Sequence, residues 1–545
     1  MRGIDGHVGR VWASPEGEAI AAAVTGDEGF QIVVVDTARP EIVEVITDTA
    51  LPEFAWGRDG EHLYIAEGEP GARRHRRAVR RRLGEPDAFV LPLSNVRALS
   101  GSADGRSLMA VSVVGDQDVV MLLEEPASSV KAVAAGPVGS VVAVQWTSGG
   151  RPALVFTGRD DHGELLVARD RDAEEWDVVH RSSRDVLRSV VWLSSGEGEE
   201  VALVQSTRHG VPVFLWLMVR ERDVVVGDAF GGAVVFAVHL LTAEAHGVRM
   251  IASSPTAAPR AVLITNDVRS RRGFPWSPPD RETRLELVPA SDGVDIPCFV
   301  TEPIGSATIV PTVVSVYGGF GLSLQPAHSS AVEEWLDSGG RWVQAMVRGG
   351  GEEGVGWHRA GRGRAKRRSV LDVVDVSAAF LASSQGAPLG LYGESIGGLL
   401  VLAAANRRTD LVSAVVAVAP VTLVETFHEQ WPGITWTAEL GDPRNPEDAA
   451  ALAEIDPLRH VAPALPSLLV TVGGQDRTVP IDHARAVVDD WQGRVRCDAS
   501  VELVVFPSAG HQWTVQDDAE RRSRTELGFL SRELLQWQED AKEAV

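Results

Sequence analysis

The chain contains few cysteines and no long apolar segment. Its 545 residues include only Cys298 and Cys497, which are too few for a disulfide framework and lack the spacing of metal ligands. No uninterrupted apolar run reaches membrane-spanning length, and the N-terminal residues lack the apolar core of a signal peptide. We therefore predict a cytoplasmic protein that neither inserts into a membrane nor depends on a metal or an organic cofactor.

Positive charge is also scarce. The only lysines are Lys131, Lys366 and Lys542, and the formal net charge is −23, with a pI near 5.1. This balance argues against nucleic acid as a partner, because binding to phosphates needs clustered positive charge. The arginine-rich segment at residues 73–82 is the exception. We interpret it as a solvated strand and loop, and nucleic acid binding is the alternative.

The first half of the chain repeats one unit, in which a large apolar residue precedes small polar residues, a glycine turn and an apolar strand. The units start at Trp12, Trp56, Leu99, Trp146 and Trp192, and a weaker sixth unit covers residues 235–264. A repeat of roughly 40–50 residues with several short strands is typical of propeller blades. We predict an all-β propeller of six or seven blades over residues 1–278. A β-sandwich is the competing interpretation, but it would not keep this period.

A proline-rich, polar stretch at residues 270–282 has the composition of a linker. After it, apolar strand-like runs alternate with helical stretches, which predicts a mostly parallel sheet covered on both faces. We therefore expect a second, α/β domain over residues 279–545. The strand-like runs are residues 313–316, 343–347, 389–392, 412–418, 467–472 and 501–506.

The most informative motif is Gly-Glu-Ser-Ile-Gly at residues 393–397, directly after the apolar run 389–392. A strand, a sharp turn that carries a serine, and a helix follow one another in a nucleophile elbow. Glycines in this motif relieve crowding around the exposed serine. Ser395 is the predicted nucleophile. A serine hydroxyl reacts only when a base takes its proton, so a histidine and a carboxylate should follow.

Two later loops supply those groups. Asp476 follows the run 467–472, and His511 follows the run 501–506. Loops beyond the carboxyl ends of parallel strands build the site in α/β sheets, and the order Ser, Asp, His is that of α/β-hydrolases. The backbone N–H of Ile396 should donate to the oxyanion, and a second donor should come from the glycine-rich loop that starts at Tyr317.

Several segments together resemble the prolyl oligopeptidase family of serine peptidases, over about residues 285–540. The matching segments are residues 291–297, 316–320, 347–358, 393–398, 436–441, 456–461, the Asp476 loop and residues 510–511. The resemblance implies an α/β-hydrolase domain with an N-terminal propeller. It also implies that the Tyr317 hydroxyl donates to the oxyanion and that Phe320 and Trp436 line a pocket for proline.

The resemblance leaves the catalytic carboxylate open. In this family an arginine that binds substrate carbonyls usually stands two residues after the catalytic aspartate. One alignment therefore places Gln475 at the position of the catalytic aspartate and Arg477 at the position of the arginine. Another alignment, anchored on residues 479–480, places Asp476 at the catalytic position. We favour Asp476, since a neutral amide cannot stabilise an imidazolium as a carboxylate does. Arg477 stays the candidate for substrate binding.

The predicted function is hydrolysis of short peptides, favouring cleavage after proline, through an acyl-enzyme on Ser395. The resemblance implies that the propeller acts as a size filter. Three alternatives stay open: a broader hydrolase like an acylaminoacyl peptidase, a leader-removing or macrocyclising enzyme of a biosynthetic pathway, and a non-catalytic binding module. The sequence does not indicate the oligomeric state.

Overall fold

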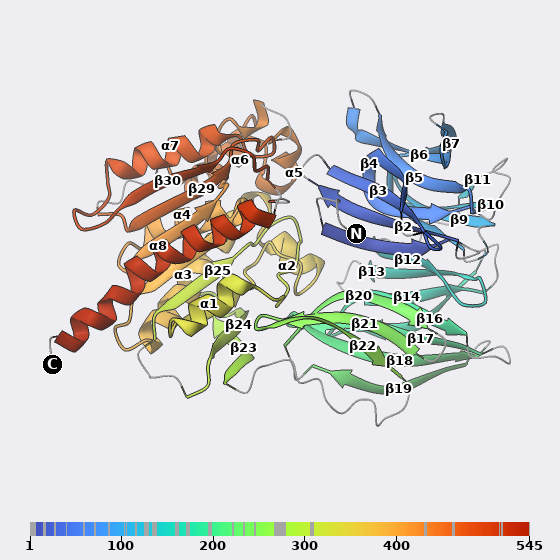
Figure 1. The fold of residues 1–545 in the computed structure, drawn as a ribbon, viewed down its shortest axis with the longest axis horizontal. Coiled ribbons are helices and arrows are strands. Elements are labelled where there is room, and N and C mark those ends of the chain that lie inside the picture. Colours follow the sequence, from blue (N-terminus) through green and yellow to red (C-terminus); the bar gives the residue numbers. More distant parts are fainter. Residues whose placement is uncertain are drawn as a thin grey trace.

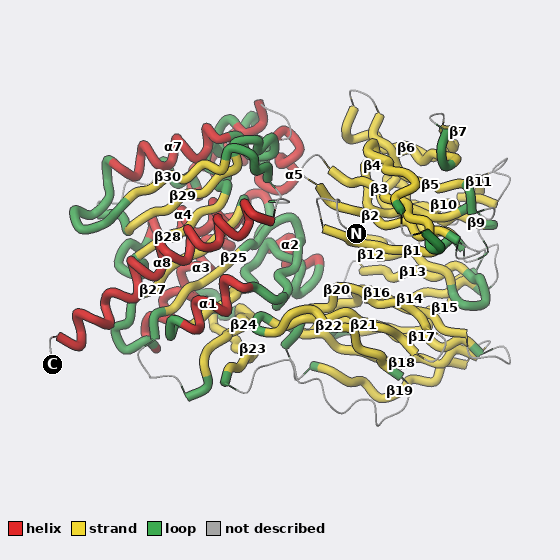
Figure 2. Tube along the Cα trace, viewed as in Figure 1, coloured by secondary structure: helices red, strands yellow, loops and turns green. Residues whose placement is uncertain are grey.

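The computed structural model of the chain consists of an all-β half and an α/β half, which lie side by side (Figure 1). Helices occur only in the C-terminal half of the described residues (Figure 2). The predicted boundary between residues 278 and 279 lies outside the described residues. The structure describes residues 7–543 except for 15–17, 27–28, 40, 58–59, 70–71, 86–87, 103, 105, 115–116, 125–129, 133–138, 159–162, 170–174, 195–198, 221–222, 233–234, 245–246, 266–279, 306–309, 430–432, 460–463, 512 and 514–515.

The N-terminal half is a β-propeller built from antiparallel sheets, in which neighbours in the chain are neighbours in the sheet. The sheets comprise β1–β7, β8–β11, β12–β15, β16–β19 and β20–β22. The strands are β1 (His7–Ala13), β2 (Ala19–Gly26), β3 (Gly29–Asp36), β4 (Ile42–Trp56), β5 (His62–Glu69), β6 (Ala72–Arg82), β7 (Ala88–Ser94), β8 (Val96–Gly101), β9 (Ser107–Val114), β10 (Gln117–Glu124), β11 (Val130–Ala132), β12 (Gly139–Trp146), β13 (Pro152–Gly158), β14 (Gly163–Ala168), β15 (Trp176–Ser182), β16 (Val186–Ser194), β17 (Glu200–Arg208), β18 (Val211–Arg220), β19 (Asp223–Gly231), β20 (Ala237–Glu244), β21 (Gly247–Ser254) and β22 (Ala257–Ile264).

The first sheet holds two blades, because its long strand β4 takes part in both. Residues 42–46 of β4 pair with β3, whereas residues 54–56 pair with β5 after an irregularity in register. With β4 divided in this way, the described strands form six blades, within the predicted range of six or seven. The weak sixth unit of the sequence corresponds to β20–β22, which form the last blade.

The repeat of the sequence has a counterpart in the backbone. Trp56, Leu99, Trp146 and Trp192 all lie at or near the end of the first strand of a blade. Near the start of such strands a β-bulge interrupts the pairing with the second strand. These bulges lie between Val8 and Val11, Val96 and Ala98, Val141 and Ala143, Leu187 and Ser189, and Val238 and Leu240. A bulge turns one side chain out of the regular ladder, so each of these blades can present an extra residue at one end.

The arginine-rich segment lies in β6, and three of its described arginines are paired with carboxylates. Arg77 lies 3.3 Å from Glu67, Arg81 lies 3.6 Å from Glu44, and Arg82 lies 2.9 Å from Glu61. These partners fit a solvated strand, which stays our interpretation of the segment.

The C-terminal half is an α/β-hydrolase domain around an eight-stranded sheet of order β23-β24-β26-β25-β27-β28-β29-β30. All neighbouring pairs from β26 to β30 are parallel, and β23 and β24 run antiparallel at one edge. The strands are β23 (Arg281–Pro289), β24 (Asp295–Pro303), β25 (Thr312–Val316), β26 (Arg341–Ala345), β27 (Leu389–Glu394), β28 (Ala414–Val418), β29 (Ser467–Gly473) and β30 (Val501–Phe506).

Helices cover both faces of this sheet (Figure 1). Val415 and Ala417 of β28 share a buried cluster with residues of α3, α4 and α7, whereas Val416 and Val418 pack with residues of α1 and α8. This explains why the central strands are apolar throughout. The helices are α1 (Ser330–Asp337), α2 (Val355–Ala360), α3 (Lys366–Ser383), α4 (Ile396–Arg407), α5 (Thr437–Leu440), α6 (Pro446–Ile455), α7 (Ile481–Gln492) and α8 (Gln516–Glu543), with short 3-10 turns η2 (Gly363–Ala365), η3 (Phe427–Glu429) and η4 (Gly433–Trp436).

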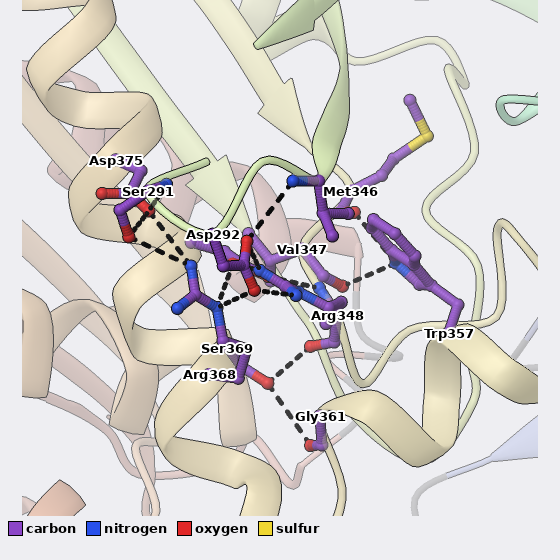
Figure 3. Close-up of polar contacts among 12 residues, drawn as sticks. Ser291, Asp292, Met346, Val347, Arg348, Trp357, Gly361, Arg368, Ser369 and Asp375 are labelled. Atoms are coloured by element: carbon purple, nitrogen blue, oxygen red, sulfur yellow. Dashed lines mark hydrogen bonds and ion pairs between the residues drawn. The ribbon is translucent and has the colours of Figure 1, made fainter. Parts of the chain in front are cut away.

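A buried arginine connects three separate parts of this domain (Figure 3). Arg348, just after β26, donates to Asp372 of α3 at 2.9 and 2.5 Å and to Asp292 of the β23–β24 turn at 2.7 and 3.1 Å. In the same turn, the N–H of Ser291 donates to Asp375 of α3 at 2.8 Å. The Asp372 side chain is 0% exposed, so its charge depends on the arginine for compensation.

Removing this arginine should destabilise the hydrolase domain strongly. Arg348→Met leaves Asp372 buried without its main cation, and breaking a buried pair in this way costs about 3–5 kcal/mol. The matched control is Arg408→Met, which removes the surface pair with Asp410 and should cost about 1 kcal/mol or less. Urea unfolding followed by tryptophan fluorescence measures both. Equal shifts of the two variants would show that the buried pair contributes no more than a surface pair.

Candidate active site

Ser395 lies in a sharp turn between β27 and α4. Its backbone has φ 56° and ψ −115°, a conformation that residues other than glycine rarely adopt. The turn is held by its backbone: the N–H of Ser395 donates to the Val418 carbonyl at 2.8 Å, and its carbonyl accepts from the N–H of Val421 at 3.2 Å. This is the local geometry that the sequence predicted for a nucleophile elbow.

The glycines around Ser395 leave no room for a side chain. A Cβ at Gly393 would lie 2.3 Å from the Gly397 carbonyl oxygen, and one at Gly397 would lie 2.4 Å from the Val316 carbonyl oxygen. At Gly398 a Cβ would meet Pro420 at 2.7 Å. The turn therefore fits only because strand β25, strand β27 and helix α4 approach one another through glycine backbone.

Asp476 and His511 contact each other directly. Oδ2 of Asp476 lies 2.7 Å from Nδ1 of His511, and the Asp476 side chain is 0% exposed. The other oxygen of Asp476 accepts the N–H groups of Thr478 and Val479, both at 2.8 Å. An ionised carboxylate at Nδ1 favours a proton on that nitrogen, which leaves Nε2 of His511 able to accept one.

The neighbours of Asp476 point elsewhere. Gln475 and Arg477 are exposed, and the amide of Gln475 donates to the Pro507 carbonyl at 3.3 Å. Of the two alignments weighed for the carboxylate position, the geometry thus brings Asp476, and not Gln475, to His511.

The candidate residues lie at one edge of the sheet. Tyr317 follows β25, Ser395 follows β27, Asp476 follows β29 and His511 follows β30. These four strands run parallel, so their carboxyl ends meet at the same edge.

The loop after β25 could supply hydrogen-bond donors beside Ser395. Burial, with smaller contributions from the Glu394 and Glu439 carboxylates, raises the pKa of Tyr317 to about 12, so its hydroxyl keeps its proton at neutral pH. Ile396 is the first residue of α4, where a helix leaves backbone N–H groups without intrahelical partners. A Cβ at Gly319 would meet the Ile396 side chain at 2.6 Å, so this loop and the start of α4 lie in close contact.

A buried group of charged side chains holds the same loop. Lys366 Nζ donates to the Gly318 carbonyl at 3.1 Å and to Glu439 at 2.7 Å, and Glu439 also accepts the backbone N–H of Phe320. Glu439 lies 2.7 Å from Nε2 of His358. Burial alone would raise the pKa of Glu439, but the hydrogen bonds from His358 and Lys366 outweigh it and lower that pKa. Sequence reasoning missed this group, although Lys366 is one of only three lysines.

Trp436 is 8% exposed and lies beside Phe427, with ring centroids 6.0 Å apart. Both rings line a small pocket, together with Leu423, Thr478, Pro480 and His483. Phe320 does not line this pocket and is 39% exposed. The pocket therefore adjoins the Asp476 loop through Thr478.

His483 of α7 is a pocket residue that sequence reasoning missed. Its Nδ1 accepts the backbone N–H groups of Thr422 and Leu423, both at 3.0 Å, so it cannot also carry a proton. Burial lowers the pKa of His483 to about 4 despite the nearby carboxylates of Asp482 and Asp476. The ring is therefore neutral at pH 7, and it ties α7 to the segment that contacts Ser395 through Val421. A histidine three residues after Pro480 was the only signal in the sequence.

Nothing in the described part of the chain suggests a metal centre, because no three His, Cys, Asp or Glu side chains there are grouped to hold an ion. Among its helices, none has the length and apolar character needed to cross a membrane.

Comparison with known proteins supports the resemblance. Residues 327–536 match the model of the prolyl oligopeptidase family. Over 218 residues the chain is 33% identical to prolyl oligopeptidase A of Amanita bisporigera, which covers 38% of this chain and 28% of that protein. It is 30% identical over 232 residues to a prolyl endopeptidase of Dictyostelium discoideum, covering 40% of this chain and 30% of the relative. The sequence match thus spans less than a third of these relatives.

The fold extends the likeness over nearly the whole chain. A solved prolyl endopeptidase structure superposes with a TM-score of 0.80 at 23% identity, covering 97% of this chain and 82% of that one. This structural match covers the propeller as well as the α/β domain, so nearly the whole chain has the fold of that prolyl endopeptidase. At the level of sequence, residues 327–536 are similar to the prolyl oligopeptidase family.

Proposed function

We propose that the chain is a serine peptidase that cleaves short peptides, with a preference for bonds after proline. The observation that carries the proposal is the 2.7 Å contact between Asp476 and His511 at the sheet edge that also carries Ser395. Peptidase relatives over residues 327–536 support the same reaction class.

The reaction would proceed in two steps. Ser395 Oγ attacks the substrate carbonyl while His511 Nε2 takes its proton, and His511 then gives this proton to the leaving amine as the peptide bond breaks. In the second step His511 takes a proton from water, and the resulting hydroxide attacks the ester on Ser395. Collapse of that intermediate releases the acid and returns the proton to Ser395. Asp476 stabilises the imidazolium in both steps.

Two donors would stabilise the negative oxygen of each intermediate. The backbone N–H of Ile396 is adjacent to the nucleophile, and the Tyr317 hydroxyl is the side-chain donor on the opposite loop. A phenol with a pKa of about 12 keeps its proton at neutral pH and can therefore donate a hydrogen bond to the oxyanion. Each such donor contributes about 10²–10³ to the rate.

The proposed preference for proline rests on a pocket lined by uncharged side chains. Trp436 and Phe427 offer aromatic surface, and His483 beside them carries no charge at neutral pH. The carboxylate of Glu439, three residues after Trp436, is already occupied by Lys366 and His358. A basic substrate side chain would therefore find no free charge there, whereas an apolar ring avoids the cost of burying an unpaired charge. Phe320 and Arg477, both exposed, would contact the substrate from outside this pocket.

The first experiment is labelling by a fluorophosphonate followed by intact-mass and peptide analysis. We expect one adduct, on Ser395. For turnover of a chromogenic prolyl peptide, Asp476→Asn should lower kcat by about 10⁴, because the imidazole loses the partner that fixes its tautomer. Gln475→Ala is the matched control and should stay near wild type. No adduct on Ser395 would favour a non-catalytic binding module, and a larger loss for Gln475→Ala than for Asp476→Asn would contradict the role of Asp476 as the partner of His511.

The proposed pocket predicts a change in specificity. Trp436→Ala should lower kcat/KM for prolyl substrates by about 10-fold or more relative to alanyl substrates, since aromatic contacts add about 0.5–1.5 kcal/mol to the area they bury. Trp176→Ala, in a propeller strand far along the chain, is the control and should leave the ratio unchanged. Equal rates of the wild type on prolyl and alanyl peptides would instead indicate the broader, acylaminoacyl-peptidase-like hydrolase.

The neutral His483 predicts a pH-dependent stability. Its pKa is about 4 in the folded protein and near 6.5 in the unfolded chain, so the unfolded chain binds the proton first as the pH falls. The contribution of His483 to the free energy of unfolding is therefore complete above about pH 6.5. It falls by about 3 kcal/mol as the pH decreases to about 4. His483→Gln keeps an acceptor without titrating. Urea unfolding at several pH values should show a steeper acid loss in wild type than in this variant, and parallel curves would contradict the assignment.

A further inference from the structure

Arg188 crosses from the propeller into the hydrolase domain. It is the extra residue at the bulge in β16, between Leu187 and Ser189. Its Nε donates to Thr207 of the neighbouring strand at 3.0 Å, which fixes the guanidinium on the propeller side. Its Nη2 donates across the interface to Ser323 Oγ at 3.0 Å and to the Gly351 and Glu352 carbonyls at 2.9 and 3.3 Å.

The acceptors of Arg188 belong to two active-site loops that contact each other. Ser323 belongs to the loop that starts with Tyr317 and Phe320, called here the oxyanion loop (residues 317–324). Gly351 and Glu352 belong to the glycine loop that follows β26 (residues 347–354). Three hydrogen bonds join the loops: Gly321 N–H to Gly349 carbonyl at 3.1 Å, Gly351 N–H to Leu322 carbonyl at 3.1 Å, and Leu324 N–H to Glu352 Oε1 at 2.7 Å.

These two loops pack closely against each other. A Cβ at Gly351 would lie 2.0 Å from the Gly321 carbonyl oxygen, so the two backbones are in direct contact. A displacement of the glycine loop would therefore move the oxyanion loop as well. Arg188 binds both loops with one nitrogen, and it does so from the other domain.

Charge strengthens the same connection. Glu352 is 1% exposed, and burial raises its pKa to about 7, while the nearby Arg188 is the cation that opposes this shift. Its Oε2 has no hydrogen-bond partner among the described residues. Without Arg188, the Glu352 carboxyl would be buried with no compensating cation, and the loop that carries it would lose its fixed position.

The two domains also pack closely against each other at other points. Val211 and Val235 of the propeller share a buried cluster with Phe299 and Met346 of the hydrolase domain. A Cβ at Gly210 would lie 2.6 Å from the Met346 sulfur, and His209 lies 3.2 Å from Glu353. This part of the propeller is thus fitted to the base of the glycine loop.

We infer that Arg188 is a positioning residue, through which the propeller holds the oxyanion loop in the geometry that transition-state stabilisation needs. The propeller then acts on turnover itself and not only on which peptides enter. The inference rests on the proposed function. It predicts that the contact between domains matters equally for a substrate too small to be filtered and for a long peptide.

The test compares Arg188→Met with Arg208→Met, which removes an arginine that donates to Asp185 within the propeller. Substrates are a chromogenic dipeptide and a peptide of twelve residues. Arg188→Met should lower kcat by about 100-fold on both substrates with KM nearly unchanged, because misplacing catalytic donors by about 1 Å costs this much. Arg188→Lys should recover part of the rate, and Arg208→Met should match wild type.

Two further measurements test the inference even if Arg188→Met folds poorly. Ser323→Ala removes one acceptor and should lower kcat by a smaller factor in a folded protein. Hydrogen exchange read by mass spectrometry should rise in residues 317–324 and 347–354 of Arg188→Met and not in Arg208→Met. Loss of activity towards the long peptide alone, or an unchanged kcat, would overturn the inference while the wild type stays active. A wild type that is neither labelled nor active would instead refute the proposed function.

Discussion

The structure of the site depends on one strained residue, Ser395. Its φ of 56° and ψ of −115° cost of the order of 1–3 kcal/mol for a residue with a side chain, so the surroundings must enforce the turn. They do so by contact between backbones, since Gly393 and Gly397 let β27 and α4 approach to distances that exclude a Cβ. The N–H of Ser395 donates to Val418 of β28, and its carbonyl accepts from Val421, which precedes the backbone donors to His483. Ser395 is thus fixed in its turn by main-chain contacts.

Much of this could be predicted because it is local in the sequence. The elbow needs glycines at fixed offsets after an apolar strand, and Asp476 and His511 directly follow strands whose order is set by the parallel fold. The blades could be recognised from their repeat, although the shared strand β4 was not foreseen, because a single strand that serves two blades lacks the turn that separates the others. That position 476, and not 475, contacts His511 could be seen only from the structure.

The residues that sequence analysis missed acquire their roles from contacts between segments that lie far apart in the chain. Lys366 meets Glu439 across 73 positions of the chain, and Arg188 meets Gly351 across 163. His483 acquires its role from backbone donors of a loop 61 positions earlier. No periodicity or spacing reports such contacts, because they follow from how whole elements pack.

Several buried charged side chains contact the oxyanion loop, and this placement has a physical reason. Tyr317 and Leu324 pack against buried clusters at the two ends of the loop, but Phe320 and Leu322 are exposed, and glycines occupy positions 318, 319 and 321. Hydrophobic packing therefore does little to select one conformation for its middle. Hydrogen bonds can select one, because their geometry is directional and a buried donor without a partner is costly. Lys366 and Glu439 hold the loop at Gly318 and Phe320, and Arg188 and Glu352 hold it at Ser323 and Leu324. Desolvation makes such groups expensive in themselves. Their presence here is consistent with a loop whose position matters more than the stability it contributes, and one of its four supports comes from the propeller.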